Sequence, residues 1–466
     1  MVYFAALSFY FVLLLCLSLA FARKNTNLED YFLASRNLTG FLVFLSVSAS
    51  WLGASSTLVS TDEALQSGLS SFWVMGMPTV ATVLVFALFL ARPIRNLSFI
   101  SLPDLVEKRY GRTVRHLASV LIVWYMILLA ASQMVALGGF LKSFIGTSYF
   151  LSLLLGTAVV LAYSVSGGFR SVVITDGLQF FFLVSGLLVL FCVLSGSGSL
   201  TNLGEAAAQA GKDQYFNLFF DFKKNLLIFI SFTLAWIISP ITWQRIQGAN
   251  NLRSAKRGLF SSAVVLFLLY GVIILIGMMS VSSLSSPPSQ APLLSSLISS
   301  RGGSVLGIFL FVAIVSAIMS TLDTAINTGA LSLTRDVFQQ VFHFGEGSHP
   351  VLWGRAATLV IGLLSFLVAT RFQNILKTLG LASEILAEGM FIPGVAMLFL
   401  KRRLPRAGLF SLLLGSLFAL TGFLVEAGIL GLNWPQWPHS VPYGLALSAG
   451  GFFFGAVLDL KNKIPY

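Results

Sequence analysis

The sequence is poor in charged residues and in the side chains that many enzymes use. Only 10% of its 466 residues are charged, whereas a soluble domain carries about a quarter. The four histidines are scattered, and the chain contains neither an HExxH motif nor a Cys/His cluster. No Walker A motif for nucleotide hydrolysis is present. We therefore expect no enzymatic activity and no work driven by nucleotide hydrolysis.

Cysteine is also scarce. Cys16 and Cys192 both fall inside apolar segments, so the sequence predicts no disulfide framework. The first apolar segment has no basic residue before it, and its positive charges, Arg23 and Lys24, follow it. This order argues against a cleaved signal peptide and favours an anchor whose N-terminus lies outside.

Long apolar runs dominate the chain instead. It is 56% hydrophobic, with a mean hydropathy of +0.89. Because a bilayer span needs roughly 20 apolar residues, we predict an all-α polytopic membrane protein that forms one domain over residues 1–466. The thirteen predicted spans are about 2–21, 40–60, 71–91, 114–138, 147–164, 171–195, 224–243, 258–282, 304–333, 353–371, 375–400, 407–426 and 441–459.

The basic residues predict the orientation of these spans. With the N-terminus outside and the C-terminus in the cytoplasm, most of the 29 Lys and Arg residues fall in cytoplasmic loops. Arg245 is counted among these loop residues. The net charge of +12 then reflects topology anchors that face anionic lipid, so we expect a lipid bilayer as partner and no nucleic acid.

One apolar run, residues 304–338, is threaded with hydroxyl groups. Ala317, Ser320 and Thr321 follow an i, i+3, i+4 spacing, so they share one face of a helix. Two hydroxyl oxygens beside a backbone carbonyl suit a small hard cation. The alternative is that these hydroxyls bond to the carbonyl one turn back or to a neighbouring helix.

The second predicted span is crowded with Ser, Ala and Gly in its first half. Such a helix can unwind in the middle of the membrane if its freed carbonyls face a cavity or an ion. Close helix packing through small residues is the alternative for Gly53. Trp51 is a large ring among small residues, which favours a place in a cavity wall.

Asp176 is an acid near the cytoplasmic end of the sixth span. A charge at the bilayer centre costs roughly 2.5–3.5 kcal/mol, and less near the ends. Asp176 should therefore face water, a cation that leaves toward the cytoplasm, or a basic partner such as Arg170 or another loop residue.

Six segments, taken in order, resemble motifs of one family, the sodium:solute symporters. The similarity extends over about residues 28–430. The segments are DYFLASRNLTG (30–40), SLPDLVEKRYG (101–111), GGFRSVVITDGLQ (167–179), WQRIQGANNLRSAKRG (243–258), AIMSTLDTAINTGALSLTRDVF (317–338) and PGVAMLFLKRRLPRAGLFSLLLG (393–415).

The resemblance implies a LeuT-type core of two inverted five-helix repeats. In this chain the repeats would be about 40–195 and 224–400, with peripheral helices at 2–21, 407–426 and 441–459. The implied sodium site uses the carbonyls of Ala49, Leu52 and Ala317 and the hydroxyls of Ser320 and Thr321.

Asp176 would lie on the ion's inward path. A second sodium ion in the family uses a hydroxyl at the position of Ala317, which has none here. Ser316 is adjacent, but on a helix it points about 100° away. We therefore expect one sodium ion.

The solute cavity should lie between spans two, three, four, seven and eleven. The expected wall residues are Trp51, Ser55, Ser56, Phe72, Gln133 and Trp236. For Phe72, Gln133 and Trp236, ordinary packing in the core is the alternative.

Five acidic residues in or near the spans have no basic residue at a similar depth in the membrane. Their presence favours a solute that bears an amine or several hydroxyls. They could equally line an outer vestibule or pair with loop bases. They are Asp62, Glu63, Asp323, Glu384 and Glu388.

These observations predict a sodium-coupled symporter in the cell (inner) membrane that imports a small organic solute by alternating access. No obligatory protein partner is expected. One alternative is a proton-coupled or uncoupled transporter of the same fold, with Asp176 and Glu384 as titrating groups. Another is a transporter-like solute sensor.

Overall fold

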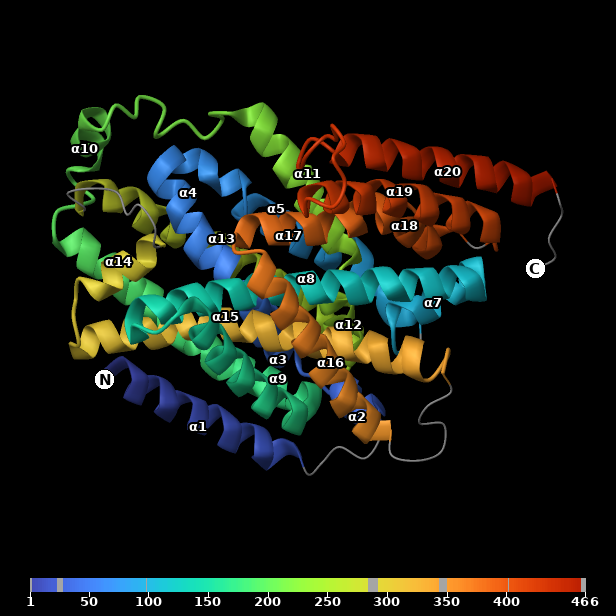
Figure 1. Cartoon of the computed structure of the whole chain (residues 1–466), viewed down its shortest axis with the longest axis horizontal. Coiled ribbons are helices and arrows are strands. Elements are labelled where there is room, and N and C mark those ends of the chain that lie inside the picture. Colours follow the sequence, from blue (N-terminus) through green and yellow to red (C-terminus); the bar gives the residue numbers. More distant parts are fainter. Residues whose placement is uncertain are drawn as a thin grey trace.

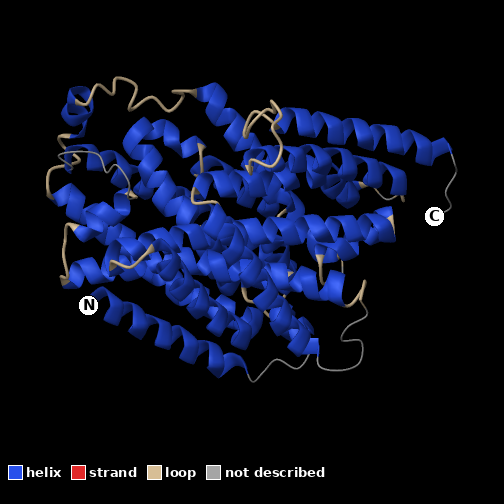
Figure 2. Cartoon of the chain, viewed as in Figure 1, coloured by secondary structure: helices blue, strands red, loops and turns tan. Residues whose placement is uncertain are grey.

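The computed structural model describes residues 2–22, 28–97, 99–283, 292–342, 350–400 and 402–461. Throughout these ranges the chain is built from helices, and Figure 2 shows no strand among them. The closest approach to sheet pairing is a single isolated bridge between Leu38 and Ala249. The all-α class predicted from composition is therefore confirmed.

The α-helices follow one another with few long connections. They are α1 (Val2–Ala22), α2 (Leu28–Leu33), α3 (Gly40–Ser50), α4 (Ser60–Ser67), α5 (Gly76–Val85), α6 (Ala91–Asn96), α7 (Leu102–Tyr110), α8 (Arg112–Ile145), α9 (Tyr149–Gly196), α10 (Leu203–Gln209), α11 (Phe222–Ile238), α12 (Pro240–Gly248), α13 (Leu252–Ser283), α14 (Leu293–Ser299), α15 (Val305–Ser332), α16 (Pro350–Arg371), α17 (Ile375–Glu384), α18 (Phe391–Phe399), α19 (Pro405–Glu426) and α20 (Val441–Lys461).

Shorter turns of other helix types extend or link them. They are the 3₁₀ segments η1 (Ala34–Arg36) and η3 (Gly68–Trp73) and the π segments η2 (Ser55–Val59), η4 (Phe86–Leu90), η5 (Leu333–Phe338) and η6 (Ile385–Met390).

Within the described ranges, ten helices are long and apolar enough to cross a membrane, or eleven if the bent pair α11 and α12 is one span. The chain is therefore a multi-pass membrane protein. Two continuous helical runs explain part of the difference from the thirteen predicted spans. The 48 residues of α9 cover the predicted fifth and sixth spans, and residues 55–96 hold the end of the second span and the whole third. The exact number of crossings stays a prediction.

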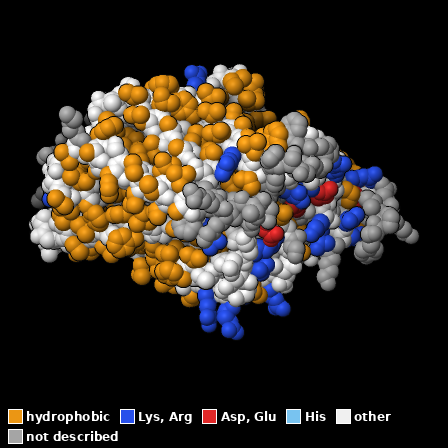
Figure 3. Space-filling model, turned by 90° about the horizontal axis from the view of Figure 1, so that it is seen from below, with side chains coloured by type: hydrophobic (Ala, Val, Ile, Leu, Met, Phe, Trp, Pro, Cys, Tyr) orange, Lys and Arg blue, Asp and Glu red, His pale blue; other side chains and the backbone are white. Residues whose placement is uncertain are grey.

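The helices form an elongated bundle whose two ends differ in charge. In Figure 1, α1 begins at the left end and α20 ends at the right end. In the view of Figure 3, the left part of the surface is mostly hydrophobic and most of the visible Lys and Arg side chains gather toward the right. The helices α3, α9 and α15 lie in the middle, α1 lies along one side, and α19 and α20 pack together on the other (Figure 1).

Two bends have visible causes in the sequence. Within α9, Gly168 has a φ of 65°, and a Cβ added there would lie 2.7 Å from the Tyr31 ring. Only glycine fits this position without strain. Between α11 and α12, Ser239 leaves the helical region before Pro240, and the two helices meet at 40°. Proline disfavours a helical residue before it, which explains the break.

Candidate functional site

The second predicted span is broken, as its Ser- and Gly-rich sequence suggests. Helix α3 ends at Ser50, the next three residues are not helical, and the π segment η2 then begins at Ser55. A Cβ on Gly53 would lie only 2.4 Å from the Thr321 hydroxyl and 2.7 Å from the Gln133 amide oxygen. Glycine therefore allows the broken segment to approach α15 and α8.

Helix α15 meets the break through hydroxyl groups. The Ser320 hydroxyl donates to the Ala49 carbonyl at 3.1 Å and to the Ala317 carbonyl at 2.9 Å. The Thr321 hydroxyl donates to the Ser50 carbonyl at 3.1 Å. All of these groups are buried. Four of the five residues of the expected sodium site thus lie together. The hydroxyls also make both of the alternative contacts, one to the carbonyl a turn earlier in α15 and the others to the neighbouring helix α3.

Leu52, the fifth residue, lies inside the break and is fully buried. Its amide donates to the Ala49 carbonyl at 3.2 Å. Ser316 faces the other way, because its hydroxyl donates to the Tyr10 hydroxyl of α1 at 2.7 Å. The helical geometry expected for Ser316 is therefore confirmed.

Gln133 of α8 supports the second half of the broken helix. Its amide oxygen accepts a hydrogen bond from the Ala54 backbone amide at 2.8 Å, and its amide nitrogen donates to the Ser132 hydroxyl at 3.2 Å. The first amides of a helix lack partners inside the helix, so a side-chain acceptor stabilises the restart at Ala54.

Beside the break lies a cavity of about 50 Å³, enough for a few water molecules. Five of the six residues expected around the solute line it, and no described lining residue carries a charge. The lining consists of Ser50, Trp51, Gly53, Ser55, Ser56, Met75, Thr79, Tyr125, Leu129, Gln133, Trp236, Ser239, Ile241, Thr321 and Leu379.

The walls of this cavity combine rings with hydroxyl groups. The rings of Trp51 and Trp236 meet edge to face, with centroids 5.0 Å apart. The Ser56 hydroxyl donates to the Trp51 carbonyl at 2.8 Å and accepts from the Tyr270 hydroxyl at 2.6 Å. The Ser55 hydroxyl is buried and has no hydrogen-bond partner among the described residues, so it is available to a solute.

Phe72 does not line the cavity. Its ring packs edge to face against Phe267 and Tyr270, at centroid distances of 5.7 and 6.4 Å. The expectation of a wall position is therefore not met, and the packing alternative describes this residue. Phe72 still reaches the cavity indirectly, because Tyr270 bonds to the Ser56 hydroxyl.

Sequence reasoning missed several lining residues, among them Thr79, Tyr125 and Ser239. Thr79 and Tyr125 sit in long apolar helices, where nothing local distinguishes a cavity-facing hydroxyl from a packed one. Ser239 had a signal, the following Pro240, which marks the break that turns this segment toward the cavity.

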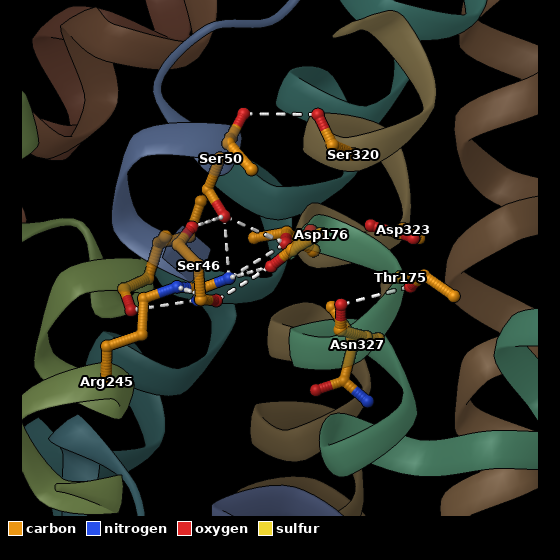
Figure 4. A network of polar contacts seen from close by, with 12 residues as sticks. Ser46, Ser50, Thr175, Asp176, Arg245, Ser320, Asp323 and Asn327 are labelled. Carbon is orange, nitrogen blue, oxygen red and sulfur yellow. Dashed lines mark hydrogen bonds and ion pairs between the residues drawn. The ribbon is translucent and has the colours of Figure 1, made fainter. Parts of the chain in front are cut away.

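A second polar cluster lies deeper in the bundle and centres on Arg245 of α12. Its guanidinium lies 3.5 Å from the Asp176 carboxylate, and both side chains are fully buried. It also donates to the hydroxyls of Ser46 at 3.0 Å, Ser50 at 2.7 Å and Thr324 at 2.9 Å. Figure 4 shows Arg245 reaching between the serines of α3 and the carboxylate of α9.

This cluster corrects the prediction for Arg245 and identifies the partner of Asp176. Arg245 is not a loop residue that anchors the topology, because α12 continues to Gly248 inside the protein and buries it. The partner of Asp176 is this arginine and not Arg170. The Ser46 hydroxyl donates to the same carboxylate oxygen at 2.7 Å. The salt-bridge alternative foreseen for Asp176 is thus the arrangement that the structure shows.

None of the five unexplained acids lines the small cavity. Asp62 and Glu63 line a larger hollow of about 1420 Å³, together with Lys142 and Lys212, which agrees with the vestibule alternative. Burial lowers the pKa of the Lys212 ammonium, which donates to the Gln66 carbonyl.

The other three acids are buried elsewhere. Asp323 accepts a hydrogen bond from the Tyr163 hydroxyl at 2.9 Å. Glu384 and Glu388 lie where α17 and η6 pack against α19 and α20. The acids therefore give no support to an amine-bearing solute in the cavity.

The sequence is similar to those of known transporters. The sequence is 24% identical over 421 residues to the sodium/glucose cotransporter of Vibrio parahaemolyticus, covering 81% of this chain and 75% of that one. It is 23% identical over 469 residues to the sodium/proline symporter of Escherichia coli K12, covering 95% of this chain and 90% of that one.

The fold is shared with solved transporters. The substrate-bound, outward-open structure of a Na⁺-coupled sialic acid symporter superposes with a TM-score of 0.81 at 18% identity, covering 98% of both chains. MhsT in complex with L-phenylalanine gives a TM-score of 0.51 at 13% identity, covering 90% of this chain and 98% of that one. The predicted LeuT-type fold is thereby confirmed. The profile of the sodium:solute symporter family matches residues 31–415, so the chain belongs to the sodium:solute symporter family.

Proposed function

We propose that this protein uses one sodium ion, bound where α15 meets the break after α3, to import a small organic solute across the cell membrane. The observation that carries the proposal is the pair of hydroxyl contacts at 3.1 Å between Ser320 and Ala49 and between Thr321 and Ser50. Hydroxyl and carbonyl oxygens are the ligands that small hard cations prefer.

The ion would be held by the carbonyls of Ala49, Leu52 and Ala317 and the hydroxyls of Ser320 and Thr321. The hydroxyls would then turn their lone pairs toward the ion and give up their bonds to the α3 carbonyls. Two observations favour a single ion at this place. Ala317 offers no side-chain oxygen, and the neighbouring Ser316 hydroxyl is turned toward Tyr10.

Sodium would couple to the solute by holding the two helices together. The cavity shares Thr321 with the ion site, and its lining residues Ser50 and Gly53 directly follow Ala49 and Leu52, so an ion that fixes these ligands also fixes one cavity wall. Binding of one ligand then favours the state that binds the other. One charge moving across about 100 mV supplies roughly 2.3 kcal/mol, and a tenfold sodium gradient adds about 1.4 kcal/mol. The sum would support a several-hundred-fold solute gradient.

The cavity favours a solute without net charge, because its lining combines rings, hydroxyls and one amide and contains no charged side chain. The printed names of two relatives give proline and glucose as solutes, and a zwitterion or a sugar would suit such a lining. The orientation with the N-terminus outside belongs to the proposal. It is supported by the opposite ends at which α1 begins and α20 ends, and by the basic residues gathered toward one end.

Uptake into proteoliposomes tests the proposal. Purified protein is reconstituted, an inward sodium gradient is imposed, and labelled proline, glucose and a panel of other neutral solutes are offered. We expect accumulation of one solute class that disappears when potassium replaces sodium outside. Accumulation driven by an inward proton gradient in the absence of sodium would instead establish the proton-coupled alternative.

A further inference from the structure

Helix α17 and the π segment η6 carry two buried acids that neither the ion site nor the solute cavity uses. Glu384 is the last residue of α17, and Glu388 lies one turn later in η6. Their exposed fractions are 3% and 0%. Residues four apart lie on one face of a helix, so both side chains point the same way. Single π turns occur often at functional positions.

Both carboxyl groups face the start of α20. The Ser440 hydroxyl donates a hydrogen bond to a Glu384 carboxylate oxygen. The Glu388 carboxyl lies against Gly444, where an added Cβ would come within 2.2 Å of its oxygen. Ser440 and Gly444 are one turn apart and joined by a backbone hydrogen bond of 3.2 Å. Both acids therefore pack against the first turn of α20 and the serine that precedes it.

No base compensates this pair. Among the described residues, neither acid forms an ion pair, and both oxygens of Glu388 lack a hydrogen-bond partner. Glu426 of α19 adds a further like charge that acts on Glu384, and Glu426 itself pairs with Lys377 of α17. His439 precedes Ser440 in the chain, but its side chain is exposed and forms no ion pair with either acid among the described residues. Two unpaired carboxylates in such surroundings repel each other and lack solvation.

We infer that Glu384 and Glu388 form a proton-binding site that holds α17 and η6 against α20. A proton on Glu388 removes one of the two like charges and provides a donor for a neighbouring oxygen. The site sits on a wall between the two hollows, since Leu379 of α17 lines the cavity and Leu381 lines the larger hollow. Loss of the proton loosens the packing of this wall, so proton occupancy sets how firmly the cavity is covered.

Infrared spectroscopy of the purified full chain tests the site directly. A protonated carboxyl group has a carbonyl stretch that ionised carboxylates lack. We expect wild-type protein at neutral pH to show this band, and Glu388→Gln to lose part of it. Glu205→Gln, on the exposed helix α10, is the matched control and should retain the band in full. A spectrum in which Glu388→Gln matches wild type would overturn the proton site.

Thermal unfolding provides an independent test of the proton-binding site. Raising the pH from about 6 to about 9 should lower the Tm of wild type by several degrees, because deprotonation places two like charges at the start of α20. The Tm of Glu388→Gln, which mimics the protonated form, should change by less than half as much. An equal pH response in both proteins would contradict the inference. So would a sodium-induced rise in Tm that Glu388→Gln abolishes, because the pair would then bind sodium and not a proton.

Discussion

The guanidinium of Arg245 lies 3.5 Å from the carboxylate of Asp176, with both side chains at 0% exposure. Through this pair and the hydroxyls around it, four elements that are distant in sequence are joined. They are α3 through Ser46 and Ser50, α9 through Asp176, α12 through Arg245 and α15 through Thr324. The proposed ion site adjoins this cluster, because the Ser50 carbonyl accepts from Thr321 while the Ser50 hydroxyl accepts from Arg245.

Replacing Arg245 alone should destabilise the protein more than replacing both members of the pair. Arg245→Met leaves the Asp176 charge buried without a partner, which costs roughly 3–5 kcal/mol. The double variant Arg245→Met with Asp176→Asn removes that charge and should recover a large part of the lost stability. The measurement is the Tm in detergent of both variants and wild type. A double variant as unstable as the single one would show that the pair is not what holds the cluster.

Gly53→Ala should weaken sodium binding. The added Cβ would lie 2.4 Å from the Thr321 hydroxyl, so the break must move away from α15. Overpacking of this kind costs typically 1–3 kcal/mol. We expect a several-fold rise in the sodium concentration that gives half of the maximal Tm shift. Gly271→Ala is the control, since nothing lies within 4 Å of its Cβ. An unchanged half-point in Gly53→Ala would contradict the close approach.

The arrangement proposed for the ion was predictable to a large extent because its chemistry is local. The Ser- and Gly-rich half of one span predicts a break, and the i, i+3, i+4 spacing places Ala317, Ser320 and Thr321 on one face. The structure brings these two features together. The identity of the facing residues was not predictable, because periodicity gives the face of a helix and not its neighbour.

Arg245 shows why other residues of the site could not be predicted from the sequence. The polar sequence around it is typical of a loop, and only the helix α12 reveals that it is buried. The surroundings of Phe72 and of the buried acids could not be predicted for a related reason. An aromatic or acidic residue in an apolar span predicts that a partner or a cavity exists, but the partner lies on another helix. For Glu384 it is Ser440, 56 residues away.

Trp51→Ala should impair solute binding much more than Phe72→Leu. The Trp51 ring lines the cavity and meets Trp236, whereas Phe72 lies behind Tyr270. For Trp51→Ala we expect KM of sodium-driven uptake to rise about tenfold or more, equivalent to roughly 1.4 kcal/mol. Phe72→Leu should change KM less than about threefold. Equal effects in the two variants would argue against the cavity as the solute site.

At the basic end of the bundle, Arg115 should hold α7 against the end of α15. Its guanidinium lies 2.6 Å from Asp104 of α7 and 3.0 Å from Asp336 of η5, and it also pairs with Glu107. Arg115→Gln leaves Asp336 buried without its charge partner and should cost roughly 3 kcal/mol or more. Limited proteolysis near α7 and the Tm in detergent measure the effect.

Arg112→Gln is the control for this prediction, because Arg112 is exposed and makes one contact, to the Gln340 carbonyl at 3.4 Å. Its Tm should stay within about 1 °C of wild type. If Arg115→Gln were as stable and as resistant to protease as this control, the ion pairs would not be holding α7 in place.

The most direct test of the account is the effect of sodium on the stability of the double variant Ser320→Ala with Thr321→Ala. A ligand that binds only the folded state raises its stability by mass action. Wild-type protein should gain several degrees in Tm when sodium chloride replaces potassium chloride at equal ionic strength, and the double variant, still folded, should gain none. A double variant that keeps the full sodium-dependent rise would contradict an ion bound between α15 and the break after α3.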